Sequence, residues 1–295
     1  MKQLRSVGVH DGSFHADEVT ACGLLIMYNL VDRDKIYRSR DPEVLASCEY
    51  VCDVGGEYNP EKKMFDHHQS SYVGNLSSAG MILSYLRDEQ IISQEEYKFL
   101  NSALVKGVDD QDNGRFFSEE GFCSFSDIIK IYNVPEEEKN ELVKAFNEAI
   151  DFTLNLLKKL RIQFFYNQEC KKIVAMEMEK SSLLLEFDKP LSWLENFFSL
   201  GGEFHPGLFI LFPCDGLWVL RGIPPNFKER MKVRVPFPGS WSGLLGKDLC
   251  KKSGIRGAVF CHKGLFISVW QTKEAALQAL KLTLSMKGIS YDDNF

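Results

Sequence analysis

The chain has 295 residues, of which 44% are hydrophobic and 26% charged, and its formal net charge is −6. This length suits two domains, and the composition is ordinary for a globular protein. The negative charge argues against a generally basic nucleic-acid-binding protein, although it does not exclude a local basic groove. No apolar run reaches the ~18–20 residues that span a bilayer.

The predicted elements alternate in the first half of the chain. Strands are expected at residues 4–9, 36–38, 50–54 and 64–66, and helices at 16–30, 41–47, 77–86 and 94–107. This alternation predicts βαβ units and a parallel sheet. Ligands of such sheets bind beyond the carboxyl ends of the strands.

The pattern changes after residue 140. Apolar residues recur at three- and four-residue steps from 141 to 165, which predicts one long amphipathic helix. Short strands are expected at 172–177, 208–212, 217–221, 257–261 and 265–270, before a final helix that begins near 272. We therefore expect three parts: a domain over 1–140, a linker helix over 141–168 and a second domain over 169–295.

The eight cysteines are scattered and include no Cys-x-x-Cys pair. In a chain of this size they are expected to be reduced and mostly buried, as in the cytosol. Because no signal, transit or transmembrane segment is recognisable, the sequence predicts a cytoplasmic protein.

Histidine and aspartate residues gather where the predicted strands end. Four of the six histidines lie in the first 68 residues. The candidates are His10, Asp11, His15 and Asp17 after the first strand, Asp53 after the third, the run Asp66-His67-His68 after the fourth, and Asp109, Asp110 and Asp112 in a later acidic turn. Any one of them alone is more often a cap, a turn residue or a satisfied core group. Together they predict a metal site.

The donor types also indicate the metal and its chemistry. Carboxylates suit Mg²⁺ and Mn²⁺, and imidazole shifts the preference toward Mn²⁺ or a later transition metal. Two such ions ~4 Å apart can activate a water and steady both oxygens of an in-line displacement at phosphorus. A bridging carboxylate is needed for that, and Asp53 is our choice.

Asp66-His67-His68, with the preceding Asp53 and the following Asp109, resembles the motif set of the DHH phosphoesterase superfamily. The MYG1 family is more similar still, over nearly the whole chain. The matching segments are His10–Glu18, Arg40–Pro42, Asp53–Tyr58, Asp66–Gln69, Val108–Gly114, Pro236–Leu244, Val259–His262 and Thr272–Ala276. The resemblance implies an α/β fold with a DHH-like parallel-sheet N-terminal domain, a smaller α/β C-terminal domain joined by a long helix, and an active cleft between them. It also implies Mn²⁺ and phosphodiester hydrolysis, and eukaryotic members are described as 3′-to-5′ RNA exonucleases.

The resemblance also implies a role for each residue of the cluster. Asp53 would bridge two Mn²⁺ ions, with one site completed by Asp17, His67 and Asp109, and the other by His15 together with His10 or Asp11. His68 would face the substrate phosphate. Many DHH enzymes have an aspartate where this chain has His15, so the metal preference can differ. Asp110 and Asp112 remain alternatives to Asp109.

A phosphate-binding surface also needs cations and donors opposite the metals. The candidates in the second half are Arg234, Arg256 and His262, although most such residues are solvated surface groups. Trp241 is either a base-stacking residue or a core anchor.

Taken together, the sequence predicts a Mn²⁺-dependent phosphodiester hydrolase that holds two ions per active site, with Mg²⁺ or another divalent ion as an alternative. The expected activity is a 3′-to-5′ exonuclease on single-stranded RNA or a short oligonucleotide, with no membrane and no obligate protein partner. One alternative is a phosphoesterase for a small substrate such as a short oligonucleotide, a cyclic dinucleotide or pyrophosphate. The other is a non-catalytic protein that binds metal and nucleic acid.

Overall fold

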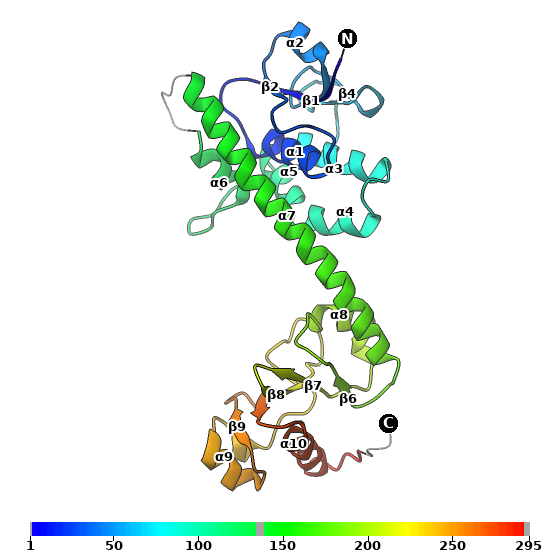
Figure 1. Ribbon diagram of the computed structural model, residues 1–295, viewed down its shortest axis with the longest axis vertical. Helices are drawn as coiled ribbons and strands as arrows, with labels where there is room; N and C mark the ends of the chain where they lie inside the picture. The colour runs from blue at the N-terminus through cyan, green and yellow to red at the C-terminus, as the bar shows by residue number, and fades with distance from the viewer. Residues whose placement is uncertain (1, 134–138, 292–295) are drawn as a thin grey trace. The chain divides into compact units, whose positions relative to one another are not determined.

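A computed structural model describes residues 2–133 and 139–291. The chain divides into two compact units, Met1–Phe164 and Phe165–Phe295 (Figure 1). A 40-residue helix, α7 (Lys139–Met178), carries the chain from the first unit into the second. The predicted boundaries at 140 and 168 remain a prediction.

The first unit is built on a five-stranded sheet in the order β2-β1-β3-β5-β4. Its strands are β1 (Gln3–Val9), β2 (Ile36–Arg38), β3 (Cys48–Cys52), β4 (Tyr58–Asn59) and β5 (Met64–Phe65). β1 pairs in parallel with β2 and β3, and β3 pairs in parallel with β5, while β4 lies antiparallel to β5. The parallel sheet predicted for this half of the chain is confirmed.

Alternation along the strands gives the sheet two apolar faces. Val7, Val9 and Tyr50 belong to the core that also contains the buried residues of α1 (Ala16–Met27) and α3 (Ser78–Asp88). Gly8 points the other way, toward α2 (Pro42–Ser47), where an added Cβ would lie 2.8 Å from Leu45 Cδ2. A larger residue at this position would have to shift the Leu45 side chain.

The remaining helices of the first unit place the acidic segment. α4 (Gln94–Leu100) continues through the π-helical turn η2 (Asn101–Val105) into α5 (Lys106–Asp112), and α6 (Phe125–Ile131) follows. The prediction of an acidic turn over 108–114 is therefore wrong for most of its length, because 108–112 are helical. The helix places Asp109 and Asp112 one turn apart on neighbouring positions of one face.

The second unit begins inside α7, and the strand predicted at 172–177 is wrong. Cys170 and Val174 are buried, and Met178 packs beside Val174, so the four-residue apolar step simply continues to the end of the helix. The chain then forms a second five-stranded sheet in the order β6-β7-β8-β10-β9. Its strands are β6 (Leu184–Glu186), β7 (Phe209–Cys214), β8 (Leu217–Gly222), β9 (Ala258–Cys261) and β10 (Ile267–Trp270).

Helices α8 (Leu194–Ser199), α9 (Gly246–Ser253) and α10 (Lys273–Ser285) complete the second unit, with the short helices η3 (Gly202–Phe204) and η4 (Gly239–Trp241). Its core contains Trp241 and Trp270, whose rings meet at 5.9 Å, together with Phe209 and Phe237. Trp241 is 1% exposed and is a core anchor, which excludes the base-stacking alternative.

The structure confirms the predicted α/β class, with a mostly parallel sheet in the first unit and a smaller mixed unit after a long helix. Among the helices described, none combines the length and the apolar character that crossing a membrane requires.

Candidate metal centre

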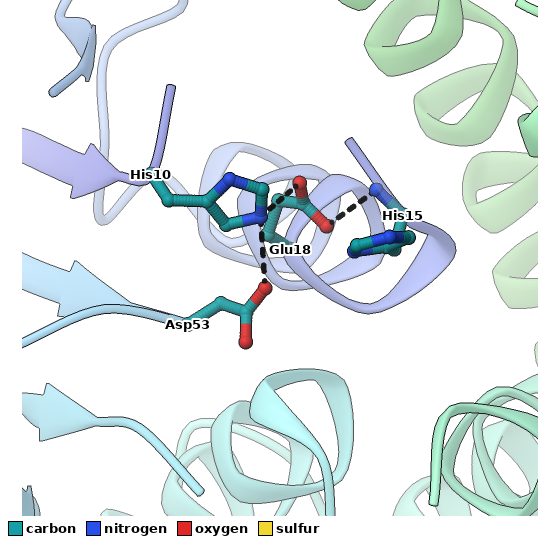
Figure 2. Close-up of side chains that lie close together, drawn as sticks. All are labelled: His10, His15, Glu18 and Asp53. Atoms are coloured by element: carbon teal, nitrogen blue, oxygen red, sulfur yellow. Dashed lines mark hydrogen bonds and ion pairs between the residues drawn. The ribbon is translucent and has the colours of Figure 1, made fainter. Parts of the chain in front are cut away.

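Three strand ends bring the candidate site together. His10 directly follows β1, Asp53 follows β3 and Asp66 follows β5. Because these strands are parallel neighbours, their carboxyl ends share one edge of the sheet. The first turn of α1 faces the same edge and adds His15 and Glu18, as Figure 2 shows.

One group of possible ligands comprises His10, His15, Glu18 and Asp53, each of which offers an atom within 4.8 Å of the others. His10 Nε2 lies 3.0 Å from Glu18 Oε1 and 3.2 Å from Asp53 Oδ2. The other ring nitrogen, Nδ1, is 2.9 Å from the carbonyl oxygen of Asp11 and donates to it. This backbone bond turns Nε2 toward the carboxylates, as in metal-binding histidines.

Two further groups adjoin the first, and they share His67 with each other. Asp17, His67 and Asp112 form one, and Asp53, His67 and His68 form the other. Asp53 therefore contributes to groups on both sides, which is the position that a bridging carboxylate must have. His67 Nε2 lies 3.3 Å from Asp53 Oδ1 and 3.2 Å from Asp112 Oδ2.

The backbone of Asp53 is itself unusual. Its φ of +59° lies in the left-handed region, which side-chain-bearing residues rarely adopt. The conformation is held by the bond from its amide to the carbonyl of Phe65, at 3.0 Å. Such strain is typical of residues whose side chain must be aimed at a functional site.

Several buried atoms of the cluster have no hydrogen-bond partner within the described residues. They are Asp17 Oδ1, Glu18 Oε1, Asp53 Oδ1 and His67 Nε2, of which the last three lie within ion-pair distance of another member of the cluster without forming a hydrogen bond. Buried polar atoms are normally satisfied, so groups left open in this way indicate a missing partner. A divalent cation satisfies carboxylate oxygens and imidazole nitrogens at once, and the mixed donor set fits Mn²⁺ or a later transition metal.

The charges of the cluster are strongly coupled to one another. Burial by itself lowers the pKa of His10, but its contacts with Asp53 and Glu18 outweigh burial and raise the pKa to about 10. His67 behaves in the same way, and the Asp53 and Asp112 carboxylates raise its pKa to about 9. Burial, with Asp17 nearby, raises the pKa of Asp112 to about 7.

Asp109 has a different environment from Asp112. Its Oδ1 accepts bonds from the Ser77 amide at 2.9 Å, the Ser77 hydroxyl at 2.7 Å and the Gly80 amide at 3.1 Å. This carboxylate thus caps the start of α3. The structure brings Asp112, and not Asp109, together with Asp17 and His67.

Asp66 orients His68 and lies outside the three groups. Its Oδ1 accepts from the His68 amide at 3.1 Å and lies 2.9 Å from His68 Nδ1, while Oδ2 accepts from the Gly56 amide at 2.6 Å. The His68 side chain is 64% exposed and can reach a substrate. Asp11 is exposed, 3.4 Å from Arg40, and its side chain is in none of the groups.

Glu18 is the residue that sequence reasoning missed. It appears there only as an acidic residue that suits a helix N-terminus. In the structure its side chain is fully buried, and Oε2 accepts from the His15 amide at 2.9 Å. The available signal was its position three residues after His15, which places both on one side of the first turn.

The cations predicted to bind substrate do not form one surface. Arg256 is exposed two residues before β9, and His262 directly follows the same strand, so they lie at its opposite ends. His262 stacks on Phe266 at 4.4 Å, and its Nδ1 accepts from the Gly264 amide.

Arg234 is a correction, because its guanidinium is used inside the second unit. It donates to the carbonyl oxygens of Pro224, His205, Gly207 and Gly202 at 3.2, 2.6, 2.7 and 2.6 Å. The guanidinium thus donates its Nε hydrogen, both hydrogens of one terminal nitrogen and one hydrogen of the other. Few donors are left to bind a phosphate. Arg234 links loop carbonyls by hydrogen bonds, and its guanidinium is not free for bidentate binding to a substrate.

Comparison with known proteins agrees with this site. The profile MYG1_exonuc, of the family described as Uncharacterised protein family (UPF0160), matches residues 6–284. The MYG1 protein of Chlamydia pneumoniae is 62% identical over 289 residues, which are 98% of this chain and 100% of that protein. A Mus musculus protein named MYG1 exonuclease is 29% identical over 325 residues, covering 95% of this chain and 85% of that protein.

Among solved structures, the crystal structure of exonuclease RecJ bound to manganese covers 98% of this chain and 91% of its own at 11% identity, with a TM-score of 0.27. A score this low supports neither a shared fold nor a shared function.

The α/β fold and the cluster define a protein with a candidate metal centre at the edge of a parallel sheet. The chain belongs to the MYG1 family, as its motifs predicted.

We expect Asp112→Asn to weaken Mn²⁺ binding at least about tenfold. Loss of a metal ligand should lower the affinity at least as much as loss of a residue that hydrogen-bonds to a ligand and orients it. Asp109→Asn is the matched control, since its amide oxygen can still accept from Ser77 and Gly80. Calorimetric titration of each purified variant with Mn²⁺ measures the difference. The reverse order of affinities would make Asp109 the ligand.

Metal affinity should rise with pH. In the metal-free protein His10 and His67 carry raised pKa values, about 10 and 9, so both hold a proton at neutral pH that an incoming metal must displace. Affinity for Mn²⁺ should therefore increase from pH 6.5 to 9, by about tenfold per pH unit for each proton displaced. Titrations in buffers of different ionisation enthalpy count those protons, and a flat affinity over this range contradicts the expectation.

Arg234→Ala should lower the free energy of unfolding by about 2–4 kcal/mol, the sum expected for four hydrogen bonds to carbonyls. Arg230→Ala is the control, because Arg230 is exposed and donates to one carbonyl only, that of Phe227. Denaturant unfolding compares the two variants. Unchanged stability in Arg234→Ala with weakened substrate binding would restore the original prediction.

Proposed function

We propose that this protein is a Mn²⁺-dependent phosphodiesterase that acts as a 3′-to-5′ exonuclease on single-stranded RNA. The observation that carries the proposal is Asp53, a buried carboxylate that is shared between two groups of possible metal ligands. The name of the mouse relative, MYG1 exonuclease, supports the same activity. The cytoplasmic location remains a prediction.

The proposed roles follow from the geometry of each side chain. Asp53 would hold both ions, with His10, His15 and Glu18 on one side and Asp17, His67 and Asp112 on the other. When bound, two such ions supply an activated water and neutralise charge on the phosphate oxygens. Glu18 extends the ligand set derived from the resemblance, and Asp112 takes the place of Asp109.

His68 is an exposed residue of the cluster and is open to substrate. The Asp66 carboxylate accepts its Nδ1–H and fixes the ring, so Nε2 is turned outward. The exposed ring would contact a phosphate oxygen and hold it at the centre. Arg256 and His262 remain proposed contacts for the rest of the strand.

The net charge of −6 favours a second candidate, hydrolysis of a small phosphate substrate such as a dinucleotide or pyrophosphate. Long single strands normally bind along an extended basic track. A non-catalytic binding protein is the third alternative. Dependence of cleavage on substrate length separates the first two, and turnover separates both from the third.

We expect the Mn²⁺-loaded protein to shorten end-labelled single-stranded RNA stepwise. Asp53→Asn should reduce the rate at least about 100-fold, because even residues that only orient a metal ligand can contribute that much to activity. Asp34→Asn, an exposed carboxylate of the same unit outside the cluster, is the control.

Gel electrophoresis with either end labelled reads both the rate and the direction. Cleavage of a dinucleotide alone would favour the small-substrate candidate. Tight Mn²⁺ binding without turnover on any phosphodiester would leave the binding protein.

A further inference from the structure

A pocket of about 400 Å³ adjoins the metal centre within the first unit. The loop before α1, the end of α5 and one side of α6 enclose it. It shares His15, Asp17 and Asp112 with the groups of possible ligands, so one end of the pocket is the metal centre itself. Its size is in the range of small-ligand sites.

The far wall of the pocket is held rigidly. Asn133 accepts from the Phe14 amide at 2.9 Å and donates to the Phe14 carbonyl at 2.7 Å, which fixes the loop that carries His15. Gln111 donates to Asp127 at 3.0 Å and accepts from the Ser124 hydroxyl. A wall whose amides are already paired is preformed and loses little entropy when a ligand binds.

Two polar side chains of α6 remain open in the wall. Ser126 and Lys130 are four residues apart on α6, and both line the pocket. Neither makes a side-chain hydrogen bond or ion pair with any residue in 2–133 or 139–291. An exposed lysine in the same pocket as Asp17 and Asp112, with no carboxylate partner of its own among those residues, suits an anionic ligand that reaches the metal centre.

The remaining wall is partly apolar, through Phe14 and Ala16. A nucleoside matches this combination, because its base has a flat apolar face and its sugar and phosphate carry acceptors. We infer that the pocket binds the terminal nucleoside next to the scissile phosphate, with Lys130 and Ser126 donating to its sugar or phosphate oxygens. The inference rests on the proposed function.

The direct test is binding of a nucleoside 5′-monophosphate to the Mn²⁺-loaded protein, measured by calorimetry. Lys130→Ala should weaken it about tenfold, the effect of a lost charge-assisted hydrogen bond. Ser126→Phe should weaken it further by filling the space. Lys98→Ala, an exposed lysine on α4 of the same unit outside the pocket, should not change it.

Turnover of a dinucleotide and of a phosphodiester without a base supplies a second readout. Both pocket variants should raise KM for the dinucleotide more than for the base-free diester, with Mn²⁺ affinity and melting temperature as in the parent protein. The outcome that supports the inference is a selective loss in the two α6 variants alone.

Three results would overturn the inference about the pocket. They are no monophosphate binding by the parent protein, binding by both α6 variants as tight as that by the parent protein, and binding of inorganic phosphate as tight as that of the nucleotide. The last would reduce the site to an anion contact. Absence of turnover of both single-stranded RNA and the dinucleotide in the parent protein refutes the proposed function instead, and monophosphate binding still decides the pocket.

Discussion

The structure of the centre depends on the parallel register of β1, β3 and β5. Parallel neighbours end at the same edge, and this brings His10, Asp53 and Asp66 together although 56 residues separate the first from the last. Asp53 lies on the middle strand, and its left-handed backbone is held by β5. The shared carboxylate is therefore a consequence of strand order.

Burying so many ionisable groups costs free energy unless each has a partner. Within the centre the partners are other members of the same cluster: burial favours the neutral carboxylates, while the pairing of histidine with carboxylate favours the charged forms. Protonated His10 and His67 can balance the carboxylates without metal, and a divalent ion provides the same compensation with better geometry. The cluster can therefore release protons from its histidines when it binds a metal ion.

A second layer holds the ligands in place. Asp66 fixes His68, Asp109 caps α3 beside Asp17, and Asn133 clamps the loop that carries His15. Each of these residues is polar and partly or fully buried, with its hydrogen bonds directed to backbone or to another side chain of the site. Such support keeps side chains within the small tolerance that metal binding and catalysis require.

The sequence by itself determined the α/β alternation, the long amphipathic helix and the residues that meet at the strand ends, because these follow from local periodicity and from motifs close together in the chain. Only the tertiary structure placed Asp112, and not Asp109, beside Asp17 and His67, brought Glu18 next to His10 and gave Arg234 four carbonyl partners. Those outcomes depend on which groups from distant segments share a buried space. A carboxylate or guanidinium has the same sequence signal whether it meets a helix terminus, a loop carbonyl or a metal.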